Sequence, residues 1–184
     1  MFFYFRRGTI CCVGLWIESG AKVELSVKTP VPVEMPRVIA KARIDDKGRI
    51  KLAADYLHFF EALPEQKVFV TSLDRRIAEI YPISTWREME RFLAEKEHMP
   101  EARRAANNAA LLGGECDVDG QGRVNINSEL RRVLGLDGQD LHIQPYKRNR
   151  IRILSENAYA AMMAELEGAD PEKDEEVLRN AGRP

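Results

Sequence analysis

Residues 42–52 read "ARIDDKGRIKL", and residues 116–126 read "CDVDGQGRVNI", which repeats the same pattern. Both stretches contain Asp-x-x-Gly-Arg, and the second motif follows the first at an offset of 74 residues. Apolar residues alternate with polar ones around each motif, as is typical of strands on either side of a turn. The repetition predicts two similar structural units in one chain.

Each residue type in the motif has a physical role. Glycine adopts a backbone conformation closed to most residues, so the chain can turn tightly between two strands. Aspartate can accept hydrogen bonds from the amides of the turn, or pair with the arginine four residues on. Arginine carries a planar set of donors, which suits a phosphate or the edge of a guanine. The motif residues are Asp45, Gly48 and Arg49 in the first copy and Asp119, Gly122 and Arg123 in the second.

Two interpretations of the motif are open at this point. The aspartate and the arginine can simply hold a hairpin in shape, or the two copies can form a surface that presents arginine twice. The second interpretation is favoured because the motif is duplicated and its first copy lies in a basic segment. Residues 37–51 contain six Lys or Arg against two Asp, a local charge of +4.

The same order of elements follows both motifs. A short helical pattern comes first, at residues 56–60 and 130–134. Two apolar strands come next, "KVFVTSL" and "RIAEIYP" in the first copy and "DLHIQPY" and "RIRILSE" in the second. A helix then opens in each copy, with Ser84 or Ser155 as the predicted N-cap. A unit of about 45 residues is too small for a stable core of its own, so the two units are expected to share one.

Further helices are predicted between and after the copies. Pro100 is expected to start a helix that ends at residues 113–114, where two glycines follow each other. Another helix is expected at residues 156–166. The helix between the first copy and Pro100 has apolar side chains at helical spacing, namely Trp86, Met89, Phe92 and Leu93.

The composition is typical of a soluble globular protein, with 184 residues, 45% of them hydrophobic and 31% charged. The formal net charge of −1 gives no support to a nucleic-acid or membrane partner. The charge is distributed unevenly, however. The segment "YKRNRIR" has four cations and no acid, whereas residues 165–176 have seven acids and one Lys. A single basic face can therefore meet an anionic partner.

The sequence contains none of the common catalytic or metal-binding motifs. Cys-x-x-Cys, Gly-x-Ser-x-Gly, His-Glu-x-x-His and the Gly-rich phosphate loop are all missing, and the three histidines are scattered. The sequence therefore predicts a protein that is not an enzyme, with no catalytic residues, no metal and no cofactor. The few cysteines favour a reducing compartment.

The first 34 residues differ in character from the rest. Two arginines, a short apolar run at residues 10–17 and small residues after it loosely imitate a signal peptide. The run is too short to span a bilayer, which needs about 20 residues. An export signal, a functional extension and a membrane anchor at "TICCVGLWI" are open alternatives, but a translation start further along, at Met35, or a poorly ordered tail is favoured.

The motifs "DDKGR" and "DGQGR", on tandem repeats joined by a two-helix linker, resemble the MraZ family of bacterial transcriptional regulators, relatives of AbrB-type DNA-binding domains. The resemblance runs from about Met35 to near the C-terminus and includes "IYPISTWREME" and the acidic "DPEKDEEVLRNAG". Family members often have Pro soon after each motif arginine, where this chain has "GRIKLA" and "GRVNIN".

The resemblance implies an α+β fold in which two tandem AbrB-like swapped-hairpin repeats share a β core, with flanking and linking helices. The expected parts are an N-terminal extension outside the family pattern (1–34), the first repeat (37–86), a helical linker (87–114), the second repeat (115–158), and a C-terminal helix with an acidic tail (159–184).

The resemblance also implies a function. The expected protein is a sequence-specific DNA-binding regulator of the division and cell-wall gene cluster that acts through direct-repeat promoter boxes. It would be cytoplasmic and nucleoid-associated, with double-stranded DNA and a ring-like homo-oligomer as partners, and with no membrane and no small-molecule substrate. The predicted DNA-binding residues are Arg43, Lys47, Arg49 and Arg123, and the predicted turn-forming residues are Asp45, Gly48, Asp119 and Gly122.

We expect the first motif to carry more of the contact, because its surroundings are more basic. The alternative function is that of a non-catalytic, oligomeric protein-interaction module that does not bind DNA.

Overall fold

The computed structural model describes residues 34–183. The predicted N-terminal extension, residues 1–34, therefore lies outside the described residues except for Glu34. The strands are β1 (Ala40–Ala42), β2 (Arg49–Lys51), β3 (Lys67–Thr71), β4 (Ala78–Pro82), β5 (Gly114–Asp117), β6 (Arg123–Asn125), β7 (Leu141–Tyr146) and β8 (Arg150–Ser155). The helices are α1 (Ala54–Glu61), α2 (Ile83–Glu95), α3 (Pro100–Leu112), α4 (Ser128–Leu134), α5 (Glu156–Glu167) and α6 (Pro171–Asn180).

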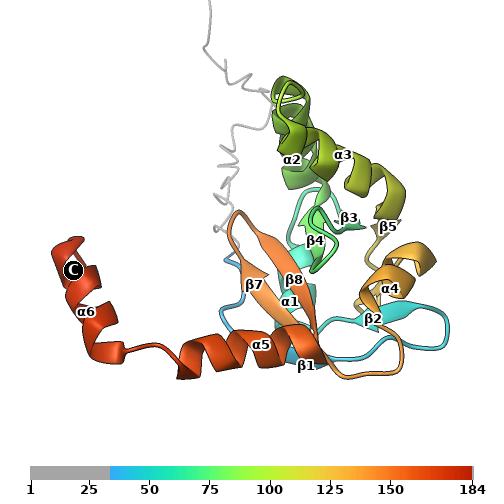
Figure 1. Cartoon of the computed structure of the whole chain (residues 1–184). Coiled ribbons are helices and arrows are strands. Elements are labelled where there is room, and N and C mark those ends of the chain that lie inside the picture. The colour runs from blue at the N-terminus through green and yellow to red at the C-terminus, as the bar shows by residue number, and fades with distance from the viewer. Residues whose placement is uncertain (1–33, 184) are drawn as a thin grey trace, which may run out of the picture. The chain divides into compact units, whose positions relative to one another are not determined.

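Six of the strands form one antiparallel sheet in the order β1-β7-β8-β4-β3-β5, and β2 pairs with β6 in a separate two-stranded ribbon (Figure 1). This strand order shows that the two repeats exchange strands. Strand β1 of the first repeat pairs with β7 of the second, and β5 of the second repeat pairs with β3 of the first. The pairing of β4 with β8 joins the two hairpins at the centre of the sheet. The prediction of an α+β fold with a shared β core is confirmed.

One hydrophobic core serves both repeats. Ile50 of β2 and Val124 of β6 are fully buried, and they belong to the same cluster as Phe59 of α1, Leu130 of α4 and Ile151 of β8. The two-stranded ribbon and the helices α1 and α4 thus contribute to the apolar core under the six-stranded sheet. Since neither repeat could bury enough apolar surface alone, the shared core is the physical reason for the exchange of strands.

The linker helices pack on another part of the sheet. The indole of Trp86 stacks on the ring of Phe69 with 4.1 Å between centroids, and it meets Tyr81 edge-on at 5.2 Å. Trp86 and Leu93 are buried as their spacing predicted, and Met89 packs against the same cluster. The expectation that Phe92 belongs to this apolar face is wrong, because its side chain is 50% exposed. Phe92 lies on a neighbouring side of α2 that no described element covers.

The helix starts follow the predictions in part. Ser155 caps α5, since its Oγ accepts a hydrogen bond from the amide of Ala158 at 3.2 Å. Ser84 is not a cap, because α2 begins one residue earlier, at Ile83, with Pro82 in the N-cap position. Pro100 starts α3 as expected. The acidic tail contains α6, whose cap is Asp170; neither α5 nor α6 buries a side chain.

The second basic segment is built into the sheet. Arg150 and Arg152 of β8 both pair with the carboxylate of Glu79 on β4, at 3.2 Å each. The guanidinium of Arg152 also lies 3.3 Å from the centroid of the Tyr146 ring. Both arginines therefore serve the junction of the two repeats. In the part of the chain that the structure describes, no helix is long and apolar enough to cross a membrane.

Candidate nucleic-acid interface

The first motif forms a tight hairpin turn. The amide of Asp45 donates to the carbonyl of Arg49 at 2.8 Å, and the amide of Gly48 donates to the carbonyl of Asp45 at 2.9 Å. The carboxylate Oδ1 of Asp45 accepts from the amides of Lys47 and Arg49 at 3.0 and 2.9 Å. Gly48 has a φ of +78°, a conformation that side chains disfavour. The turn therefore uses the aspartate and the glycine in the roles that their residue types indicate.

The side chain of Arg49 also stabilises this turn, through hydrogen bonds to Asp45. Its Nε and Nη2 both donate to Oδ2 of Asp45, at 3.0 and 2.7 Å, so one carboxylate oxygen accepts two charge-assisted hydrogen bonds. These hydrogen bonds, with those from the turn amides, lower the pKa of Asp45 to about 2. The same hydrogen bond raises the pKa of Arg49, so both groups are charged over the whole physiological range.

The second motif forms the same turn without the side-chain pair. The amide of Asp119 donates to the carbonyl of Arg123 at 3.0 Å, and that of Gly122 to the carbonyl of Asp119 at 2.8 Å. Oδ1 of Asp119 accepts from the amides of Gln121 and Arg123, at 2.9 Å each. The hydrogen bond from the amide of Arg123 is the main reason that the pKa of Asp119 is lowered. Within residues 34–183, the guanidinium of Arg123 forms no ion pair.

The two motif strands meet in the ribbon of β2 and β6. Cα partners across the ribbon are Arg49 with Asn125, Ile50 with Val124, and Lys51 with Arg123. Because side chains alternate between the two faces of a strand, the buried central pair leaves the four flanking side chains on the outer face. This outer face of the ribbon consists of Arg49, Lys51, Arg123 and Asn125.

The ends of the ribbon join the two hairpins to each other. The amide of Leu52 donates to the carbonyl of Gly122 at 2.8 Å, and the amide of Ile126 donates to the carbonyl of Gly48 at 2.9 Å. Each strand of the ribbon is thus continued by a hydrogen bond to the motif glycine of the other repeat. The two motifs therefore form one continuous surface.

The outer face of the ribbon contains a pair of like charges that does not stabilise the fold. Lys51 and Arg123 lie directly opposite each other, and like charges in that position destabilise a strand pair. Lys51 is exposed, and among the described residues neither side chain has a carboxylate partner within ion-pair distance. A bound polyanion would relieve this repulsion.

Three of the four predicted DNA-binding residues lie in or beside the ribbon, and the fourth lies apart from them. Arg49 and Arg123 lie together on the ribbon, and Lys47 is exposed in the first turn. Arg43 precedes the turn and forms an ion pair with Asp140, just before β7, so a carboxylate already neutralises it. Lys51 and Asn125 complete the outer face, but they were not among the predicted residues. Their signal in the sequence is the matched alternation of "RIK" and "RVN" at the 74-residue offset.

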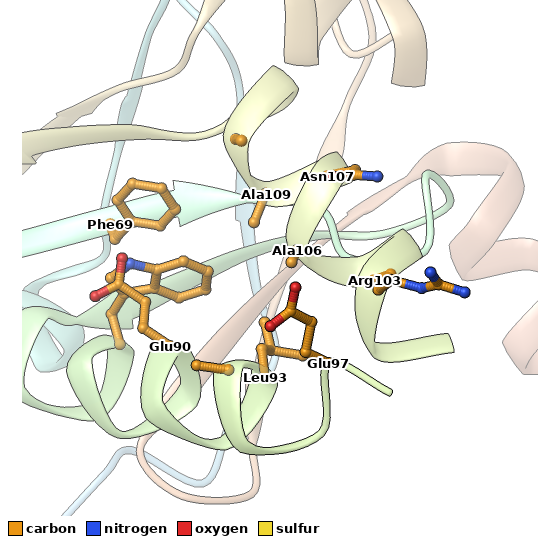
Figure 2. A pocket seen from close by; sticks show the side chains of 11 residues that line it. Phe69, Glu90, Leu93, Glu97, Arg103, Ala106, Asn107 and Ala109 are labelled. Carbon is orange, nitrogen blue, oxygen red and sulfur yellow. The ribbon is translucent and has the colours of Figure 1, made fainter. Parts of the chain in front are cut away.

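A groove between α2 and α3 is a different kind of surface (Figure 2). Phe69 lies at one end of it. The ring of Phe69 stacks on that of Trp86, which also lines the groove, and the volume of the groove is about 480 Å³. Glu90 of α2, Glu97 in the turn after α2 and Arg103 of α3 contribute polar groups. In residues 34–183, no three His, Cys, Asp or Glu side chains gather in a way that could hold a metal ion.

The pairing of Asp45 with Arg49 predicts a pH-dependent stability. The pKa of Asp45 falls from 3.8 to about 2 on folding, so the pair stabilises the protein fully above about pH 4 and ceases to do so as the pH falls through about 2. We expect Asp45→Asn to lower Tm at neutral pH by an amount that shrinks below about pH 4. Asparagine keeps an oxygen for the turn amides, so the variant removes the charge and the two hydrogen bonds from Arg49 but leaves the hydrogen bonds of the turn.

Thermal melts of both proteins between about pH 7 and about pH 3 measure this difference. A difference in Tm that stays constant over that interval would contradict the assignment.

The chain is similar in sequence to several known proteins. The chain is 34% identical over 97 residues to a protein of Acidobacterium capsulatum, covering 52% of this chain and 66% of that protein, which is just under two thirds. It is 35% identical over 99 residues to one of Koribacter versatilis, covering 53% of this chain and 67% of that protein. It is 33% identical over 137 residues to one of Saccharopolyspora erythraea, covering 74% of this chain and 92% of that protein.

No family model matches the chain. All three relatives are named transcriptional regulator MraZ, and such regulators are not enzymes, as the sequence predicted for this chain. The match to the Saccharopolyspora protein spans nearly the whole of that relative. The chain therefore belongs to the MraZ family of transcriptional regulators.

Proposed function

We propose that this protein regulates transcription by binding double-stranded DNA in a sequence-specific manner through the outer face of the ribbon. The observation that carries this proposal is the placement of the exposed Lys51 opposite the half-buried Arg123, with neither paired to a carboxylate among the described residues. The major groove of B-DNA admits a two-stranded ribbon. Arginine and lysine suit guanine edges, and asparagine suits adenine, so the four side chains include both kinds of reader.

The local charge explains how a nearly neutral chain can bind a polyanion. The formal net charge is −1, but residues 165–176, which follow both motifs in the sequence, hold seven acids against one Lys. Binding by one small face would be weak for a single subunit. We propose that a ring-like homo-oligomer places several such faces on successive direct repeats. Once one subunit binds, its neighbours meet the next repeats at a high effective concentration, so several weak contacts together give a higher affinity.

The resemblance to MraZ proteins supports a more specific target. We propose direct-repeat, G-rich boxes in the promoter of the division and cell-wall gene cluster, and a cytoplasmic, nucleoid-associated location. The predicted sites Lys47, Arg49 and Arg123 lie in or beside the ribbon, with Lys51 and Asn125 added by the structure. Arg43 is paired with Asp140 and precedes the first turn, so it lies outside the ribbon.

Arg49 is expected to matter more than Arg123. Arg49→Ala removes a cation and leaves the carboxylate of Asp45 unpaired beside the ribbon, where it repels phosphate. Arg123→Ala removes a cation only. We therefore expect a larger loss of DNA affinity from Arg49→Ala, measured by fluorescence anisotropy at a temperature where both variants are folded. An equal or smaller loss would show that the carboxylate of Asp45 has no such effect.

A second candidate function is that of a protein-interaction module without DNA binding. The groove between α2 and α3 favours it, because the stacked rings of Phe69 and Trp86 line the groove. The exposed Phe92 also lies on α2. This function needs neither the ribbon nor a salt-sensitive interaction.

One titration separates the two functions. The full chain is added to a labelled duplex with tandem G-rich boxes and to a scrambled duplex, each at two salt concentrations. We expect tighter binding to the repeats, and weaker binding at higher salt because the release of counterions into a more concentrated salt solution gains less free energy. Absent or equal binding to both duplexes, from folded and assembled protein, would contradict sequence-specific DNA binding and favour the interaction module.

A further inference from the structure

The two motif hairpins have different supports, although the backbone hydrogen bonds of their turns are the same. A Cβ atom placed on Gly48 would come within 2.9 Å of the guanidinium of Arg131, so the first turn lies directly against this side chain. A Cβ atom placed on Gly122 would come within 3.3 Å of Leu57. Leu57 and Arg131 are themselves separated by the 74-residue offset, so they occupy equivalent positions in α1 and α4. Figure 1 shows α4 beside β2.

Arg131 is held firmly in this place. Its Nε donates to the carbonyl of Ile126 at 3.2 Å, and its Nη1 donates to the two carboxylate oxygens of Asp137 at 2.8 and 3.0 Å. Only 22% of the side chain is exposed. Ile126 in turn donates its amide to the carbonyl of Gly48. Arg131 therefore connects the first turn, the end of β6 and the loop after α4.

The second hairpin has no comparable clamp among the described residues. Leu57 gives it an apolar contact, and Asp119 makes no ion pair with Arg123. The first hairpin has its own ion pair, Asp45 with Arg49, and it packs against the guanidinium of Arg131, which Asp137 holds in place. Charge-assisted hydrogen bonds fix this guanidinium more tightly than apolar contacts fix the side chain of Leu57.

We infer that Arg131, a residue of the second repeat, is the positioning residue of the first-repeat hairpin, and that it preorganises this hairpin for DNA. The inference rests on the proposed function. A rigid first turn presents Lys47 and Arg49 to DNA without an ordering cost, whereas the second turn adapts to its target. Arg131 does not itself need to touch DNA.

The test compares Arg131→Leu with Arg132→Leu. Both variants remove one positive charge from α4, but Arg132 is exposed and pairs within its own helix with Glu129. Arg131→Leu also gives α4 the residue that α1 has at the equivalent position. We expect Arg131→Leu to raise hydrogen exchange severalfold in peptides covering residues 45–51 and to leave residues 119–125 unchanged. Affinity for the tandem G-rich duplex should fall about tenfold, against about twofold or less for Arg132→Leu.

Asp137→Asn provides a second arm in case Arg131→Leu disturbs folding. This variant makes the protein more positive, so charge alone predicts tighter binding to DNA. Loss of the anchor of Arg131 predicts weaker binding and faster exchange in the first hairpin. Tighter binding by Asp137→Asn, or equal effects of the two leucine variants, would overturn the inference.

The exchange measurement needs no DNA, so it judges the positioning role separately from the proposed function. In one outcome, Arg131→Leu speeds hydrogen exchange only in the first hairpin, but the protein does not prefer the repeat duplex. The positioning role of Arg131 would then stand, and the proposed DNA-binding function would be contradicted. In the other outcome, Arg131→Leu leaves hydrogen exchange unchanged, and the protein does prefer the repeat duplex. The positioning role of Arg131 would then be contradicted, and the proposed DNA-binding function would stand.

Discussion

Replacement of Lys51 and Arg123 together by glutamate is expected to abolish binding to the repeat duplex, lowering affinity by at least about a hundredfold. The two side chains lie opposite each other on the outer face of the ribbon, so the double variant turns the centre of that face from positive to negative. Phosphate contacts are lost and repulsion takes their place. Fluorescence anisotropy on the tandem and scrambled duplexes measures the loss.

A matched control separates position from net charge. Arg91 of α2 and Arg104 of α3 are both exposed, and their replacement by glutamate changes the net charge by the same amount. We expect this control to lose only a few-fold in affinity, through long-range repulsion that salt screens. Equal losses in the two double variants would mean that net charge, and not the ribbon, governs binding. Circular dichroism verifies that both remain folded.

The largest expected effect on stability comes from Gly113→Ala. A Cβ atom at this position would lie 2.3 Å from the carbonyl oxygen of Ala109 and 2.3 Å from Cζ of Phe69. The amide of Gly113 also donates to that carbonyl at 2.8 Å, so the backbone cannot move away without loss of the bond that ends α3. Overpacking of this kind costs about 1–3 kcal/mol. Such a loss lowers Tm by roughly 2–4 °C per kcal/mol in a chain of this size.

The next residue provides the control for this prediction. A Cβ atom on Gly114 would have no neighbour within 4 Å, so Gly114→Ala is expected to leave Tm nearly unchanged. The displaced ring of Phe69 stacks on Trp86, and the damage should therefore reach the packing of α2 on the sheet. Melting curves of the two alanine variants test the pair. Similar Tm values would mean that the junction of α3 and β5 adjusts freely.

The sequence predicted the elements of this fold better than their partners. Alternation and glycine placement identified the strands, and the duplicated motif identified the two units. The pairing of β1 with β7 and of β5 with β3 did not follow from any local pattern. Strand periodicity says which side chains share a face, whereas the choice of a partner strand depends on how two units together cover one core.

The candidate site was predictable to a similar extent. The roles of Asp45 and Gly48 in a turn follow from residue chemistry, because few other residues satisfy a tight turn. Lys51 and Asn125 became apparent only when β2 and β6 were seen to pair. Arg43 was expected in the interface because it lies in a basic segment. Its ion pair with Asp140, 97 residues away in sequence, cannot be read from local charge.

The support of the first hairpin was likewise hidden from sequence reasoning. Arg131 lies in a helix that by its own pattern is an ordinary amphipathic segment, and its contact with Gly48 crosses from one repeat to the other. The repeat offset relates Arg131 to Leu57, but a leucine and an arginine at equivalent positions do not by themselves indicate a clamp.

The most direct test of the ribbon as the DNA interface is photo-crosslinking from a single position. A photoreactive phenylalanine derivative replaces Asn125, which is exposed on the outer face of the ribbon, or Asn107, which is exposed in the groove between α2 and α3. Neither replacement removes a charge. We predict that position 125 crosslinks to the labelled tandem duplex and that position 107 does not. Crosslinking from position 107, with none from position 125, would contradict the assignment of the ribbon as the DNA-binding surface.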